Sequence, residues 1–352
     1  MNHRVEAGVR GPGPSWRGRS AVALMLGVWI ASAAATAPPA WGQAVPDREA
    51  ATVRLLTVGN SFSRDATRFL GDVVAAQGDA LVHHSAAIPG GTLAQHCEKQ
   101  AIHAENPEDP RGLYDRTGRS LAQELRDGPW DFITVQQASI RSHDVSTYRP
   151  FAERLVGILR RGAPGARVVV HETWAYRIDD PRFDPAVQSA PGQPTDQEAM
   201  YGGLAGAYRT IARELEAPLI PVGDAFHLAD ADPAWGYKPD PAFDLAGAAY
   251  PVLPNQKHSL HVGRKWSKDE DGTYRMVMDG HHANVAGQYL GALVFYESLY
   301  GRSAVGCRFR PNGINAEYAR FLQETAHKAV EALKGTEFEV KSKIAAPASA
   351  SR

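Results

Sequence analysis

Strand-like and helix-like segments alternate along most of this sequence, and this alternation constrains the fold more than any other feature. Short β-branched runs are typical of buried strands, and longer runs with apolar residues three or four positions apart are typical of helices. Because strands that alternate with helices form βαβ units, we predict an α/β fold with helices on both faces of a mostly parallel sheet. The predicted strands are 53–58, 81–88, 132–136, 167–172 and 219–222, and the predicted helices are 65–76, 148–160, 198–215, 225–229 and 286–299.

Length and composition agree with one sizeable domain. The chain has 352 residues, of which 43% are hydrophobic, enough to bury a substantial core. The formal net charge is -1, from 38 basic and 39 acidic residues, and the basic residues do not form a stripe. We therefore predict a globular protein that does not bind nucleic acid.

The first segment with candidate chemistry is residues 53–67, VRLLTVGNSFSRDAT. It places Ser61 on the turn between a predicted strand and the helix that follows. This position lies at the carboxyl end of a parallel strand, where open sheets bind ligands. Asn and Ser are also common in ordinary turns, so this segment alone fits a catalytic and a purely structural role equally well.

The second segment is residues 278–284, MDGHHAN, which places Asp279 three residues before His282. A histidine base with an orienting carboxylate activates the serine of many hydrolases. On one loop, both side chains would face Ser61. We therefore interpret Ser61 as a nucleophile, His282 as its base and Asp279 as the residue that fixes the histidine tautomer. Without Ser61, the same spacing would indicate only a local hydrogen bond.

Together the two segments resemble the SGNH (GDSL-type) hydrolases, whose first block is Gly-Asp/Asn-Ser and whose last block is D-x-x-H. The register of that last block selects His282 rather than His281 as the base. Blocks between the two segments are similar, in order, to a secreted bacterial branch of this superfamily: IPGGTLAQH, WDFITVQQAS, HETWAYR and PVGDAF. The resemblance implies a three-layer α/β/α sandwich of the flavodoxin-like kind that needs no cofactor and no metal.

The resemblance also implies three hydrogen-bond donors for the oxyanion of an acyl-transfer reaction. The first is the backbone N–H of Ser61. The second is a glycine N–H, for which we choose Gly91 over Gly90, because a glycine lets the backbone approach a substrate closely. The third is an Asn side chain in the superfamily, and this sequence has Gln136 and Gln137 instead. We predict Gln137 as the third donor, and a structural role for either glutamine stays open.

Further residues are predicted to line the substrate cleft. Some follow predicted strands, and others lie in residues 231–277, an insertion rich in Pro, Gly and aromatic residues just before Asp279. A self-packed surface loop explains this insertion equally well. The predicted lining residues are Asn60, Gly90, Gln136, His171, Glu172, Trp174, Trp235 and Trp266.

The two ends of the chain differ in composition from the predicted domain, residues 45–335. Residues 1–44 combine arginines, an apolar run and a small-residue processing site, as in a cleavable export signal, and the run is too weak for a stable membrane span. Residues 336–352 are expected to form a disordered tail. Cys97 and Cys307 would both enter an oxidising compartment, and whether they pair stays open.

These features predict a secreted or periplasmic serine esterase that forms an acyl-enzyme on Ser61. The substrate class comes from the resemblance alone: a small-molecule or carbohydrate ester, with acetyl groups on a carbohydrate as one candidate. One alternative is a non-catalytic glycan-binding module on the same fold. A weaker alternative is a metallohydrolase, because no recognised ligand spacing such as HExxH links the available residues: His83, His84, His171, Glu172, Asp224 and His227. The sequence does not indicate the oligomeric state.

Overall fold

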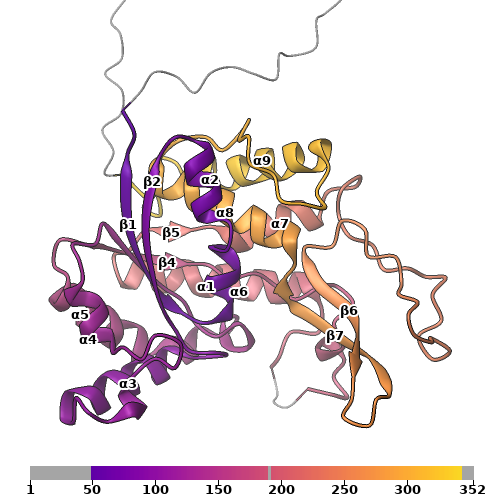
Figure 1. Ribbon diagram of the computed structural model, residues 1–352, viewed down its shortest axis with the longest axis horizontal. Coiled ribbons are helices and arrows are strands. Elements are labelled where there is room, and N and C mark those ends of the chain that lie inside the picture. Colours follow the sequence, from indigo (N-terminus) through magenta and orange to yellow (C-terminus); the bar gives the residue numbers. More distant parts are fainter. Residues whose placement is uncertain (1–48, 189–191, 343–352) are drawn as a thin grey trace, which may run out of the picture. The chain divides into compact units, whose positions relative to one another are not determined.

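Five parallel strands form the central sheet of the protein (Figure 1). The computed structural model describes residues 49–188 and 192–342. The strand order is β2-β1-β3-β4-β5, and each strand pairs in parallel with its neighbours. The predicted parallel sheet is therefore confirmed. The strands are β1 (Thr52–Gly59), β2 (Ala80–Ala87), β3 (Phe132–Val135), β4 (Arg167–His171) and β5 (Leu219–Ile220).

Helices cover both faces of this sheet, so the three-layer α/β/α class is also confirmed. Helices α3, α4 and α5 lie on the opposite side of the sheet from α8 and α9 (Figure 1). Helices α1, α2 and α7 pack with α8, and α6 packs against β4 and β5. The helices are α1 (Ser61–Ala66), α2 (Leu70–Ala76), α3 (Leu93–Glu105), α4 (Leu121–Arg126), α5 (Phe151–Gly162), α6 (Gln197–Glu214), α7 (Val222–Asp230), α8 (Val285–Tyr300) and α9 (Ala316–Glu331).

The order of the strands places a switch point between β1 and β3. The chain leaves β1 toward β2 on one side, whereas from β3 onward it continues toward β4 and β5 on the other side. Because crossover connections are right-handed, the helices after β1 and those after β3 cover opposite faces of the sheet. In open α/β sheets, ligands bind outside the carboxyl ends of the strands at such a point.

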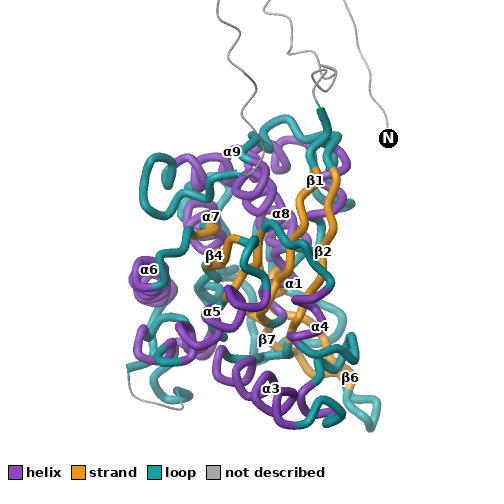
Figure 2. The backbone as a smooth tube through the Cα atoms, turned by 90° about the vertical axis from the view of Figure 1, so that its left-hand side faces the viewer, coloured by secondary structure: helices purple, strands orange, loops and turns teal. Residues whose placement is uncertain are grey.

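A two-stranded antiparallel hairpin lies outside the central sheet. It consists of β6 (His261–Lys268) and β7 (Tyr274–Ala283), with an irregular register between His261 and Gly263. The end of β7 lies beside α1 (Figures 1 and 2). The sequence did not predict this hairpin, nor did it predict α3, α4 and α9. The single helix predicted for residues 65–76 is two helices in the structure, α1 and α2, and α1 begins four residues earlier than predicted.

Helix α8 forms the core of one helical layer. Its residues are nearly all buried from Ala286 to Tyr300, because the sheet lies on one side and α1, α2, α7 and α9 pack around the others. A helix that is apolar on all sides is typical of such an interior position. Leu55, Val169 and Phe295 belong to the same continuous hydrophobic core, which joins the sheet to α8.

The C-terminal segment is more ordered than expected. Residues 336–342 were assigned to a disordered tail, but Phe338 and Val340 pack against the core, and the Phe338 carbonyl accepts a hydrogen bond from Leu219 N–H at 2.9 Å. The predicted export segment 1–44 and residues 343–352 lie outside the described residues. Within the described part of the chain, none of the helices has the length and apolar character needed to cross a membrane. Cys97 and Cys307 are buried free thiols.

Candidate active site

Ser61 is the first residue of α1 and directly follows the N-cap residue Asn60. The Asn60 side chain accepts a hydrogen bond from Phe62 N–H at 2.9 Å, which satisfies one of the N–H groups left open at a helix start. Gly59 is required before this cap, because a Cβ there would stand 2.9 Å from Gln136 Cγ. The turn therefore presents Ser61, partly exposed, at the switch point of the sheet.

His282 and Asp279 meet Ser61 from the end of β7. His282 Nε2 lies 2.9 Å from Ser61 Oγ, and His282 Nδ1 lies 3.1 and 3.3 Å from the two carboxylate oxygens of Asp279. The His282 backbone N–H also donates to Asp279 at 3.2 Å. The carboxylate holds a proton on Nδ1 and leaves Nε2 free to accept the serine proton. Both residues lie on a strand rather than on the predicted loop, and the structure brings all three side chains together.

The charges around His282 favour its role as a base. The hydrogen bond to Asp279 is the largest influence, and it raises the pKa of His282 although partial burial opposes this. Burial by itself would raise the pKa of Asp279, but the hydrogen bond from His282 and the neighbouring histidine charges hold that pKa well below its usual range. Asp279 is therefore ionised at neutral pH, where it stabilises an imidazolium on His282.

The adjacent His281 shares Asp279 with His282, since its Nδ1 lies 3.1 Å from Asp279 Oδ1, but it also has partners of its own. Its Nδ1 accepts a hydrogen bond from Arg182 Nη2 at 3.0 Å, and its ring packs against Phe62 and Tyr176. Burial and the charges of His282 and Arg182 lower its pKa to about 4, so His281 is neutral at pH 7. No contact with Ser61 is found for His281 in the part of the chain that the structure describes. His282 is the histidine in contact with the serine, as the D-x-x-H register predicts.

A buried network of amides holds the turn that carries Ser61. Gln136 Nε2 donates to Asn60 Oδ1 at 2.8 Å, and Asn60 Nδ2 donates to the Gly91 carbonyl at 3.0 Å. Behind them, His171 Nδ1 lies 3.0 Å from Gln136 Oε1. Burial lowers the pKa of His171 to about 3, so this ring is neutral and donates from Nδ1. These contacts fix the end of β1 relative to β3 and β4.

Two of the predicted oxyanion donors are already engaged. Gln137 Nε2 donates to the Thr147 carbonyl at 2.8 Å, and Gly91 N–H donates to the Ile88 carbonyl at 2.8 Å. Both groups therefore have partners of their own in this structure, and their assignment as oxyanion donors stays a prediction. Gly90 is the exposed residue of that turn and has a φ of 64°, the left-handed conformation that favours glycine. Ser61 N–H, at the start of α1, has no bonding partner within the helix.

Five of the predicted lining residues are buried instead, among them Asn60 at 1% and Gln136 at 3% exposure. His171, Glu172 and Trp174 each have 0% exposure, so they cannot contact a substrate in the cleft. Glu172 pairs with Arg209 at 2.9 Å, and Trp174 Nε1 donates to the His281 carbonyl at 2.9 Å. The assignment of these residues to the cleft surface is wrong. These three side chains lie in the interior beneath the site, because the chain beyond β4 continues into the interior rather than toward the surface.

The aromatic residues of the insertion also lie elsewhere. Trp235 stacks on Tyr318 and Phe321 of α9. Trp266 donates from Nε1 to the Val252 carbonyl at 3.0 Å, and alternation along β6 places it on the opposite face of the hairpin from Lys265, which contacts Asp279. Trp235 therefore packs the segment onto α9 and does not line the site as predicted. Trp266 packs within the segment itself, and its role in lining the site stays a prediction.

The structure also shows neighbours of the site that the sequence analysis missed. Asp65, one helical turn after Ser61, accepts a hydrogen bond from Ala283 N–H at 3.1 Å. Arg182 joins Asp180 to His281. The spacing of four residues between Ser61 and Asp65 was a usable signal, because residues four apart share one face of a helix. Nothing local in the sequence indicates that Arg182 lies near His281.

The structure does not gather the six residues considered as metal ligands. His83 and His84 lie on β2, His171 and Glu172 at the end of β4, and the last two on α7: Asp224 and His227. Among the described residues, one cluster with suitable spacing is Asp279 with the two histidines of β7, and another is His84 with Glu124 and Asp127. In the second cluster Arg119 pairs with both carboxylates, so its guanidinium already supplies a positive charge to them.

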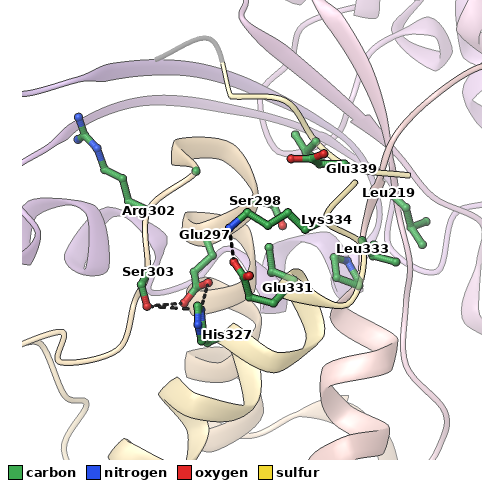
Figure 3. Close-up of a pocket in the computed structure, with 14 residues that line it drawn as sticks. Leu219, Glu297, Ser298, Arg302, Ser303, His327, Glu331, Leu333, Lys334 and Glu339 are labelled. Carbon is green, nitrogen blue, oxygen red and sulfur yellow. Dashed lines mark hydrogen bonds and ion pairs between the residues drawn. The ribbon is translucent and has the colours of Figure 1, made fainter. Parts of the chain in front are cut away.

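A cavity of about 220 Å³ lies near the other end of α8, away from Ser61 (Figure 3). Glu297, Ser303 and His327 line it and contact one another. Val285 and Glu297 are twelve residues apart on α8, and a rise of 1.5 Å per residue separates them by about 18 Å. This cavity is therefore separate from the site at Ser61.

The fold and the site define a three-layer α/β/α protein with a serine, a histidine and an aspartate assembled at the switch point. A family model described as "Domain of unknown function (DUF4886)" matches residues 54–226. No curated protein is significantly similar to the chain.

Solved structures resemble the chain over most of its length. A DUF4886 family protein from Bacteroides uniformis has 23% identity and a TM-score of 0.61, with 81% of this chain and 97% of that chain covered. A protein assigned as an SGNH hydrolase, from Slackia heliotrinireducens, has 22% identity and a TM-score of 0.42, with 70% and 98% covered. A protein assigned as a GDSL-like lipase, from Parabacteroides merdae, has 13% identity and a TM-score of 0.39, with 71% and 96% covered. The first of these structures shows that the chain shares its fold with a DUF4886 family protein.

Proposed function

We propose that this protein is a serine hydrolase that cleaves carboxylic esters through an acyl-enzyme on Ser61. The observation that carries the proposal is the placement of Ser61 and Asp279 on opposite nitrogens of the His282 ring, 2.9 Å from Nε2 and 3.1 Å from Nδ1. A relay needs this arrangement, because one nitrogen must accept the serine proton while the other is held by a carboxylate.

The proposed reaction follows from these contacts. Ser61 Oγ attacks the ester carbonyl carbon as its proton moves to His282 Nε2, and Asp279 stabilises the resulting imidazolium. The proton then passes to the leaving alcohol, and the acyl group remains on Ser61. Water, deprotonated by the same nitrogen, releases the acid and restores the serine. Ser61 N–H, at the start of α1, and Gly90 N–H, on the exposed turn, are the backbone donors that we propose for the oxyanion.

The finer part of the proposal concerns substrate and location. We propose an exported enzyme that removes acetyl groups from a carbohydrate. This part rests on the sequence resemblance and on the export-like composition of residues 1–44. Both observations are independent of the site geometry. The geometry at Ser61 is equally suited to other carboxylic esters.

The test is hydrolysis of p-nitrophenyl acetate, longer-chain analogues and acetylated sugars by the purified domain and by Ser61→Ala. We expect turnover by the parent protein and a loss of about 10⁴-fold or more in the variant, since Ser61 forms the covalent intermediate. Ser303→Ala, at the cavity near the other end of α8, is the matched control and should remain active. If neither the parent nor the control turns over any ester, the protein is instead a binding module on this fold.

A further inference from the structure

Two polar contacts join α1 to the end of β7, although the residues are more than 200 positions apart in the sequence. One is the contact of His282 Nε2 with Ser61 Oγ, at 2.9 Å. The other is the hydrogen bond from Ala283 N–H to Asp65 Oδ2, at 3.1 Å. The serine and histidine therefore meet beside a second contact between the same two elements.

Helix geometry explains why both contacts occur together. Ser61 and Asp65 are four residues apart, so they lie on one face of α1 about one turn from each other. His282 and Ala283 are consecutive on β7 and pass across this face. The next residue, Asn284, is anchored separately, because its side chain donates to the Ser259 and His261 carbonyls at 2.6 and 3.0 Å. Asp65 thus fixes β7 to the helix that carries the nucleophile.

Asp65 also brings a second carboxylate to His282. It is only partly exposed, and burial is the largest influence on its pKa, which is raised, while the charge of His282 and the bond from Ala283 oppose this rise. In return, the Asp65 charge contributes to the raised pKa of His282.

The other charged groups near His282 partly cancel. Asp279 and His281 lie on β7, and Lys265 on β6 contacts Asp279 at 3.2 Å. Arg182, from the segment after β4, contacts His281, and Arg64 on α1 lies near Asp65. Asp65 is therefore a second source of negative charge at the ring besides Asp279.

We propose that Asp65 is a positioning residue for the reaction: it holds His282 against Ser61 through the Ala283 backbone, and its charge stabilises the imidazolium formed as Ser61 attacks. This inference rests on the proposed serine mechanism. It assigns a role to a residue outside the serine, histidine and aspartate already described.

The test compares Asp65→Asn, which keeps a hydrogen-bond acceptor but removes the charge, with Asp65→Glu, which keeps the charge. Asp72→Asn, an exposed carboxylate on α2, is the control for net charge. The His282 ring is titrated by NMR in each variant. We expect its pKa to fall on the order of 0.5 to 1 unit in Asp65→Asn, and to stay raised in Asp65→Glu and Asp72→Asn.

The kinetics supply a second readout. His282 must be neutral to accept the serine proton, so a lower pKa moves the acid limb of the kcat/KM profile to lower pH. The plateau should fall by about 3- to 10-fold, because the base is weaker and the imidazolium less stabilised. A merely structural Asp65 would change neither the pKa nor the acid limb.

An unchanged His282 pKa in Asp65→Asn would overturn the inference. If Asp65→Asn does not fold, Asp65→Glu decides, and a lowered His282 pKa in that variant would overturn the inference. The NMR titration needs no turnover, so it remains decisive whatever the activity. Failure of the serine mechanism is seen separately, as full activity in Ser61→Ala.

Discussion

Both ends of α8 carry a cluster of one serine, one histidine and one carboxylate, and the clusters differ in which ring nitrogen each partner contacts. Near the N-terminus of α8, the carboxylate holds Nδ1 of His282 and the serine contacts Nε2. Near the C-terminus, both partners contact the same nitrogen of His327: Glu297 at 3.0 Å and Ser303 at 3.5 Å (Figure 3).

This difference separates a candidate relay from a structural cluster. In the second cluster, the serine hydroxyl and the carboxylate compete for one nitrogen, so the ring cannot take a proton from the serine while the carboxylate holds its other side. Glu297 instead accepts Ala304 N–H at 2.6 Å and ties the chain after α8 to α9. The same residue types therefore support catalysis or packing according to geometry.

The largest expected effect is at the two histidines. His282→Gln should lower kcat/KM for p-nitrophenyl acetate by about 10⁴-fold or more, because no group remains to accept the serine proton. His327→Gln, the matched change at the second cluster, should leave kcat/KM unchanged. Equal losses in the two variants would show that activity follows folding rather than the relay, so circular dichroism spectra of both are required.

A smaller effect is expected at the two carboxylates. Asp279→Asn should lower kcat by about 10² to 10⁴-fold, since an amide no longer holds the productive tautomer of His282. Glu297→Gln should leave kcat unchanged but lower the Tm by about 2 to 4 °C, through a weaker contact with His327. Steady-state kinetics and thermal unfolding of both variants measure these effects. A loss of kcat in Glu297→Gln without a change in Tm would contradict a purely structural role for Glu297.

Much of the fold could be predicted from the sequence because its main strands are fully buried. Buried parallel strands such as β1 and β4 read as continuous apolar runs, and their alternation with helices fixes the class. The β6–β7 hairpin was missed because exposed and buried positions are mixed along both strands. Helix α9 was not predicted, although its buried residues recur at helical spacing: Tyr318, Leu322, Ala326 and Ala329.

The site was only partly predictable. Ser61, Asp279 and His282 were found because motif spacing identifies them, and long-range packing then brings them together. The sequence could not choose between Gln136 and Gln137, because neighbouring residues at a strand end point in different directions and sequence does not say which direction faces the site. Trp174 was misplaced because a residue after a strand can turn inward as readily as outward.

The most direct test of the central claim is labelling of the folded protein with a fluorophosphonate probe, followed by peptide mass mapping. An activated serine reacts with such a probe and an ordinary serine does not. The proposed relay predicts an adduct on Ser61, none on Ser303, and loss of the adduct in His282→Gln. An unlabelled folded protein, or equal labelling of Ser303, would contradict it.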